Sequence, residues 1–112
     1  MFKIDQSDSY TWPVKVEVPM SGGKFEQHTF DVKFKRVSQA RLKEINKLGE
    51  LGEINDVDLC KEILVGWSGV TDGKDEIPFS EEAKDKLLDV ALVAKSVVIS
   101  FYESLSGAKR KN

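Results

Sequence analysis

The strongest constraint on the fold is a change in the spacing of apolar residues near Val37. Before this position apolar and polar residues alternate in two runs, 12–18 and 30–34, and such alternation is typical of half-buried β-strands. After Val37 the apolar residues recur every three to four positions, which is typical of helices with one buried face. The sequence therefore predicts an α+β fold, in which an N-terminal antiparallel β-hairpin (a small sheet) precedes about four α-helices.

The length fits one globular domain, because 112 residues is an ordinary domain size and leaves little room for a second core. We expect a single domain over 1–112. Its parts are a flexible N-terminus (1–9), the β-hairpin (10–37), a helical part (38–107) and a mobile tail (108–112).

Details of the hairpin also follow from residue type. Gly22 and Gly23 supply the backbone freedom that a reversal needs. Pro13 has no backbone N–H, so its strand should lie at a sheet edge or begin there. Phe25 has the opposite parity from Phe30, which predicts a bulge or a late strand start.

The helix boundaries are predicted from capping residues. The predicted N-caps are Ser38, Asn55 and Ser80. We expect Gly49 to end the first helix, Gly66 to end the second, which starts at Asp56 and has an apolar face running on to Trp67, and Gly107 to end the last. No glycine or proline marks the junction near Leu92, where we predict a bend.

Composition excludes several classes of function. The net charge of −2 gives no overall field that would attract nucleic acid. No apolar run reaches the roughly 20 residues that span a bilayer, and the N-terminus is too polar for a secretory signal, so we expect a cytoplasmic protein and no membrane partner. Cys60 lies on the apolar side of its helix and is expected to be buried, away from His28. With these as the only Cys and His residues, no metal or cofactor is predicted.

The stretch GWSGVTDG, residues 66–73, is predicted to be a structural corner. Trp67 and Val70 are expected to point inward, while the glycines and the Asp72-Gly73 pair let the chain turn. The residues predicted to form this corner are Gly66, Trp67, Gly69, Val70, Asp72, Gly73 and Pro78.

The segment from 63 to 89, together with the ending FYESLSGAKRKN, resembles the tail assembly chaperones of long-tailed (siphovirus-type) bacteriophages. Members of that family have a helix that runs into a W-x-G-V segment, an acidic glycine turn, a Pro-Phe-Ser helix start and a final helix with aromatic residues. The likeness covers the C-terminal half and is carried by Trp67, Gly69, Val70, Asp72, Pro78, Phe79, Ser80, Tyr102 and Leu105.

The resemblance implies a non-enzymatic protein that binds the phage tape-measure protein, keeps it soluble and helps to recruit tail-tube subunits. Such proteins act in the host cytoplasm and are not expected in the mature virion. The family often has a longer form made by ribosomal frameshifting. The ending Lys111-Asn112 can be encoded by a slippery sequence, so nucleotide sequencing tests whether this chain has one.

The last helix holds more apolar residues than one core-facing stripe can use, so part of it is predicted to contact a partner. The alternative is that all of them fill the core. The predicted partner-binding residues are Ile99, Phe101, Tyr102, Leu105 and Trp12. The free edge of the Trp12 hairpin further predicts self-association along the client.

Two other classes of function stay open at this point. A small nucleic-acid-binding or regulatory protein would use the basic strand 31–36 and the tail 109–111, although Lys33, Lys35 and Arg36 are also typical of a solvated strand face. An enzyme would need a concave pocket with converging polar groups.

Overall fold

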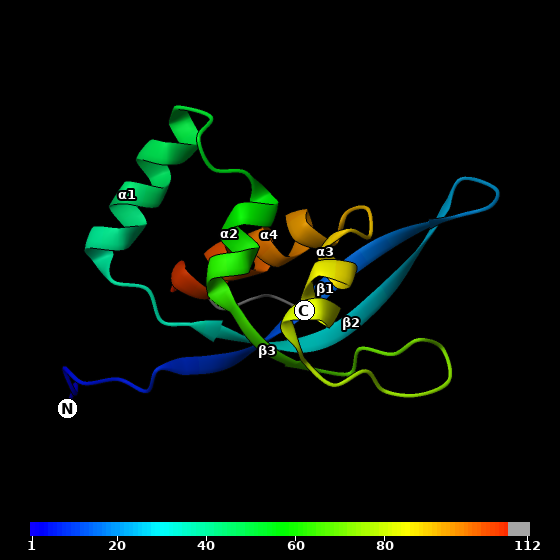
Figure 1. Cartoon of the computed structure of the whole chain (residues 1–112), viewed down its shortest axis with the longest axis horizontal. Helices are drawn as coiled ribbons and strands as arrows, with labels where there is room; N and C mark the ends of the chain where they lie inside the picture. The colour runs from blue at the N-terminus through cyan, green and yellow to red at the C-terminus, as the bar shows by residue number, and fades with distance from the viewer. Residues whose placement is uncertain (108–112) are drawn as a thin grey trace.

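The computed structural model describes residues 1–107, and the tail predicted at 108–112 lies outside the described residues. Three strands, β1 (Ser9–Met20), β2 (Lys24–Lys35) and β3 (Leu64–Ser68), form an antiparallel sheet in the order β1-β2-β3. Four helices complete this part of the chain: α1 (Gln39–Glu50), α2 (Asp56–Ile63), α3 (Glu81–Leu88) and α4 (Val93–Leu105). The predicted α+β class, with its N-terminal hairpin and four helices, is confirmed (Figure 1).

The β1–β2 hairpin forms one apolar face, as the alternation predicts. Val14, Val16, Val32 and Phe34 are all buried against the helices, because every second residue of a strand points to the same side. The turn between the strands uses Gly22 and its neighbour at positive φ. The strand that contains the first proline lies at the sheet edge, as expected.

Phe25 does not cause the predicted bulge or late strand start. The β1–β2 register runs without interruption from Ser9↔Lys35 to Met20↔Lys24, with Pro19 opposite Phe25. The Phe25 ring therefore points to the other side of the sheet, where it is 67% exposed. The only register shift in the pairing of β2 lies elsewhere, between Lys33 and Phe34 on the β3 side.

The predicted end of the second helix is wrong. Helix α2 stops at Ile63 and the chain continues directly into β3, which pairs with β2 from Asp31 to Phe34. Gly66 belongs to this strand, and a Cβ there would lie 3.1 Å from the Lys33 side chain. The region 38–107 is therefore not purely helical.

Strand β3 covers only part of the long hairpin. Its pairing with β2 spans Asp31 to Phe34, so the side of β2 that faces β3 is unpaired over residues 24–30. We call residues 17–30 the hairpin arm. The arm projects from the body of the protein (Figure 1), and within 17–29 every residue is exposed except the half-buried Val18.

The predicted N-caps are confirmed. The side chains of Ser38, Asn55 and Ser80 accept hydrogen bonds from the backbone N–H three residues later, and Asn55 forms a complete capping box with Asp58. These bonds satisfy N–H groups that have no partner within the helix. Gly49 does not end α1, which extends through Glu50, and the chain reverses instead at Gly52, with φ 69°.

The bend predicted near Leu92 is confirmed, and it separates α3 from α4. Leu92 has φ 74°, and it is the one residue other than glycine with positive φ in the described chain. The backbone reverses here without a glycine, which explains why the sequence shows no break. At the far end of α4, Gly107 follows the C-cap with φ 70°, as expected of a C-terminal glycine.

The core lies between the apolar sheet face and helices α2, α3 and α4. Phe34 and Phe101 are completely buried and pack edge to face, with ring centroids 5.3 Å apart. The core residues are Val14, Val16, Val32, Phe34, Ile45, Leu59, Cys60, Ile63, Leu64, Leu88, Val93, Val97 and Phe101.

A buried lysine joins α3 to the end of α2. The Lys84 side chain is 3% exposed, and its Nζ donates to the backbone carbonyl of Lys61 at 2.7 Å. Carbonyls in the last turn of a helix have no partner within the helix and carry the negative end of its dipole. Lys84 therefore caps α2 from a neighbouring helix.

Replacing Lys84 with methionine should lower the free energy of unfolding by about 1.5–3 kcal/mol, because a charged hydrogen bond to a backbone carbonyl is lost. Urea denaturation measures the change. Lys86→Met is the matched control, because the Lys86 side chain is 78% exposed. A Lys84→Met protein as stable as the wild type would show that the burial of the charge costs as much as the bond contributes.

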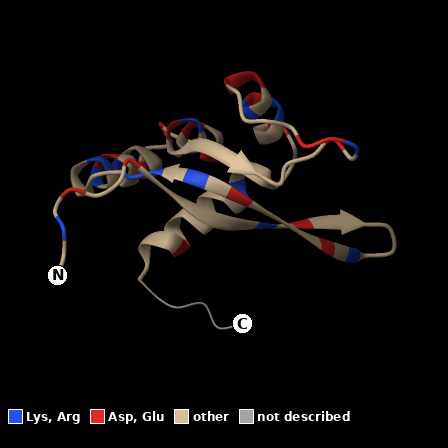
Figure 2. Cartoon of the chain, turned by 90° about the horizontal axis from the view of Figure 1, so that it is seen from below, with Lys and Arg blue, Asp and Glu red and all other residues tan. Residues whose placement is uncertain are grey.

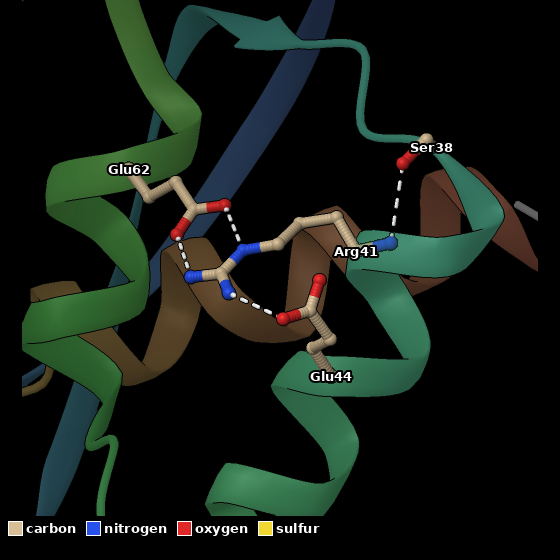
Figure 3. Close-up of polar contacts among 4 residues, drawn as sticks. All are labelled: Ser38, Arg41, Glu44 and Glu62. Atoms are coloured by element: carbon tan, nitrogen blue, oxygen red, sulfur yellow. Dashed lines mark hydrogen bonds and ion pairs between the residues drawn. The ribbon is translucent and has the colours of Figure 1, made fainter.

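Helix α1 is held to α2 by a two-bond ion pair (Figure 3). The Arg41 guanidinium donates to both carboxylate oxygens of Glu62, at 2.9 and 2.6 Å, and its third nitrogen lies 3.8 Å from Glu44. The hydrogen bonds and charge of Arg41 hold the pKa of Glu62 below its ordinary value of 4.5. The pair fixes the position of α1, which has a single fully buried side chain, Ile45.

The sign of this pKa shift predicts a loss of stability in acid. A carboxyl group with a lowered pKa in the folded state stabilises the fold above its unfolded pKa, and this contribution is lost as the pH falls through the folded pKa. Glu62→Gln should therefore flatten the fall of stability below pH 4.5, as followed by chemical denaturation. Glu44 lies farther from Arg41, so Glu44→Gln should leave the fall of stability in acid unchanged. Equal behaviour of the two variants would contradict the assignment.

Candidate partner-binding surface

Helix α4 presents two different sides. Val93, Val97, Ser100 and Phe101 are buried, at the spacing of one helical stripe. A second set of apolar side chains on α4 points to solvent: Ile99 is 48% exposed, Tyr102 38% and Leu105 44%. We call these three residues the α4 ridge.

A groove lies on each side of the α4 ridge. One groove lies between α1, α2 and α4, has a volume of about 420 Å³, and is lined by Ile45, Asn46, Ile54, Leu59, Val98 and Tyr102 among others. The other lies between β1 and α4, has a volume of about 310 Å³, and includes Lys15, Glu17, Lys95, Ile99 and Glu103. An apolar ridge between two grooves is suited to contact with a peptide segment or helix.

The structure divides the predicted partner-binding residues into two groups. Ile99, Tyr102 and Leu105 lie together on the surface as the α4 ridge. Phe101 is completely buried and belongs to the core, and Trp12 is half-buried and packs against the core. A partner can therefore reach the first group without unfolding of the domain.

The corner at residues 66–78 is held by its own hydrogen bonds. The Trp67 indole N–H donates to the carbonyl of Ile77 at 2.8 Å, and the Gly69 N–H donates to the Glu76 carboxylate at 2.8 Å. The Asp72 carboxylate accepts from the backbone N–H groups of Asp75 and Lys74, and these bonds lower the pKa of Asp72. These bonds are consistent with a structural role for residues 69–78, whereas Gly66 and Trp67, which were predicted to belong to the corner, lie in β3.

The corner also forms a groove that the sequence did not predict. Side chains of the corner and of α3 line an apolar hollow of about 420 Å³, which includes Trp67, Val70, Ile77, Leu87 and Val90. Trp67 packs edge to face on Phe79, with ring centroids 4.9 Å apart, at the start of α3. Apolar residues stand before and after the acidic turn in the sequence, and they line this hollow. Because they are far apart in the sequence, their proximity could not be predicted from it.

The two residues considered for nucleophilic chemistry are in different environments. Cys60 is completely buried and its Sγ–H points to the carbonyl of Ala94 at 3.5 Å. His28 lies on the hairpin arm, with Nε2 2.8 Å from Glu26, and both side chains are 56% exposed. The fold therefore does not bring the thiol and the imidazole together. Among residues 1–107, no cluster of three or more His, Cys, Asp or Glu side chains could hold a metal ion.

The basic strand considered for nucleic-acid binding carries charges of both signs. Lys33 and Lys35 are exposed on the sheet face that points away from the helices, and Asp31 shares that face. Arg36 stacks on the ring of Tyr10 at 4.8 Å. Figure 2 shows basic and acidic segments interspersed along the hairpin.

Comparison with protein-family models, with curated proteins and with solved structures gave no match. None of the helices within residues 1–107 has both the length and the apolar character needed to cross a bilayer. The geometry of the described residues is therefore the basis for a proposal on function.

Proposed function

We propose that the protein is an assembly chaperone of long-tailed bacteriophages, which binds the tape-measure protein, keeps it soluble and helps to recruit tail-tube subunits. The observation that carries the proposal is the α4 ridge, three apolar side chains exposed between two grooves. A long amphipathic helix aggregates through its apolar stripe, and a chaperone prevents this by covering that stripe with apolar surface of its own.

The residues that carry the family resemblance support the same proposal. Trp67, Phe79 and Ser80 form the junction between β3 and α3, while Tyr102 and Leu105 lie on the ridge. The resemblance therefore includes both residues that shape the fold and residues that a client can reach. An enzymatic function has less support, because the hollow beside α3 is lined mainly by apolar side chains and residues 1–107 hold no cluster of His, Cys, Asp or Glu that could bind a metal ion.

Co-expression tests the proposal. The client is the tape-measure protein of the same phage, and the measured quantity is its soluble fraction with and without this protein. We expect the client to be soluble only in the presence of the wild type. Ile99→Lys and Leu105→Lys, alone and combined, should reduce the soluble fraction because each places a charge in the apolar contact.

Leu51→Lys is the matched control, because Leu51 is an exposed leucine outside the ridge, 61% exposed. It should support solubility as the wild type does, and circular dichroism should show that all variants are folded. If the client is equally insoluble with and without the wild-type chain, the proposal is wrong.

Nucleic-acid binding is the second candidate, favoured by the exposure of Lys33 and Lys35 on one sheet face. A mobility shift with DNA or RNA that weakens steeply with salt would support it, because phosphate contacts release counterions. Lys33→Glu should abolish such a shift and leave client solubility unchanged. No shift at low salt would exclude this candidate.

A further inference from the structure

We propose that two copies of this chain pair through the open edge of β2 in the hairpin arm, antiparallel and two-fold symmetric about Gln27. The pairing would join the two sheets into one continuous sheet. It uses the backbone edge of β2 rather than the side chains of the α4 ridge, and it does not depend on the identity of the client.

The first step of the argument is which strand edge is available. On β1, Pro13 and Pro19 remove two backbone donors, and α4 packs beside Lys15 and Glu17. Natural proteins use proline to protect edge strands from pairing. The β2 edge contains no proline and is unpaired over residues 24–30, so it is the edge that a further strand can reach.

The second step is which backbone groups point outward. Pro13 cannot donate a hydrogen bond, so its pair with Asp31 is of the type in which neither residue bonds across to the other. Asp31 therefore directs its N–H and C=O away from β1, toward β3. Since this direction alternates along a strand, Phe25, Gln27 and Thr29 direct theirs to the open edge.

The third step is the register. The open segment begins after the turn, at residue 24, and ends at residue 30, where Gly69 lies against Phe30. A symmetric pairing that uses the whole segment has its axis at Gln27. In that register Phe25 of each copy pairs with Thr29 of the other, and the outward-pointing groups of both strands meet. Moving the axis to residue 29 would make the second copy collide with β3, and moving it to residue 25 would leave only three paired residues.

The fourth step is charge. Pairing about Gln27 places Glu26 of each copy directly opposite His28 of the other. Within one chain these side chains already lie on the same face, with His28 Nε2 2.8 Å from Glu26 Oε1. Oppositely charged or hydrogen-bonding residues directly opposite each other stabilise a strand pair, whereas like charges destabilise it. The segment is therefore complementary to a second copy of itself.

Sedimentation velocity on the full chain tests the pairing with variants that differ only in charge. The acidic variant is His28→Glu, and the basic variant combines Glu26→Lys with His28→Lys. Each alone would place like charges opposite each other twice, whereas a mixture would place Lys opposite Glu at both positions. We expect the wild type to show a concentration-dependent dimer at high micromolar concentration, each variant alone to be monomeric, and the equimolar mixture to form a heterodimer.

Two further variants test whether the backbone of the arm is needed and whether a charge change elsewhere has the same effect. Gln27→Pro removes the backbone donor at the symmetry axis and should give a monomer, while the exposed Glu53→Lys changes charge outside the arm and should dimerise as the wild type does. Circular dichroism should show all of them folded. The proposal is overturned if the wild type is monomeric throughout, if either charge variant alone dimerises as strongly as the wild type, or if the mixture stays monomeric.

Discussion

Replacing Phe101 with alanine should lower the free energy of unfolding by about 3–5 kcal/mol, the usual cost of removing a large buried aromatic side chain. Phe101 is completely buried and contacts the ring of Phe34 edge to face, so its removal leaves a cavity between α4 and the sheet. The whole stability of a small domain is about 5–15 kcal/mol. The variant should therefore unfold at a much lower urea concentration.

Ile99→Ala is the control for this prediction, because Ile99 lies on the same helix but is 48% exposed. Its midpoint of urea unfolding should stay close to that of the wild type. If both variants lost the same stability, the division of α4 into a core stripe and an exposed ridge would be wrong. The comparison thus tests the surface on which the proposed function depends.

The Cys60 thiol should be almost inert in the folded protein. Burial, and to a smaller extent the charge of Asp56, raises its pKa from 9.0 to about 12. Since the thiolate is the reactive form, this shift lowers its population at neutral pH by about a thousandfold. A thiol reagent such as Ellman's reagent should react with the native protein more slowly by at least this factor.

In guanidinium chloride the same thiol should react at the rate of a free cysteine, which provides the internal control. Cys60→Ser should abolish the signal in both states. A native rate close to the unfolded rate would show that the thiol is exposed and ionised. In that case Cys60 would again be a candidate for nucleophilic chemistry.

The parts of the fold set by neighbouring residues could be predicted from the sequence. The hairpin follows from alternation, and the helix starts follow from Ser38, Asn55 and Ser80, because each cap bonds to a backbone group three residues away. The bend near Leu92 was predicted although no glycine or proline marks it, and its left-handed backbone conformation leaves no signature in residue type.

The parts set by distant residues could not be predicted in the same way. Leu64 and Trp67 continue the helical spacing of α2, but their pairing with Phe34 and Val32 of β2 places them in a strand. Tertiary context often overrides local propensity in this way. For the candidate site, composition indicated an excess of apolar residues on α4, but only the packing shows that Phe101 points inward and Ile99 outward.

The contact between β1 and α4 also has a consequence for the order of events during synthesis. The hydroxyl groups of Tyr10 and Ser104 lie 2.7 Å apart although 94 positions separate them in the chain. An isolated hairpin is marginally stable in water, so a growing polypeptide holds its first two strands exposed until the helix that covers them leaves the ribosome. The contact between the hairpin and α4 therefore forms only after α4 has been synthesised.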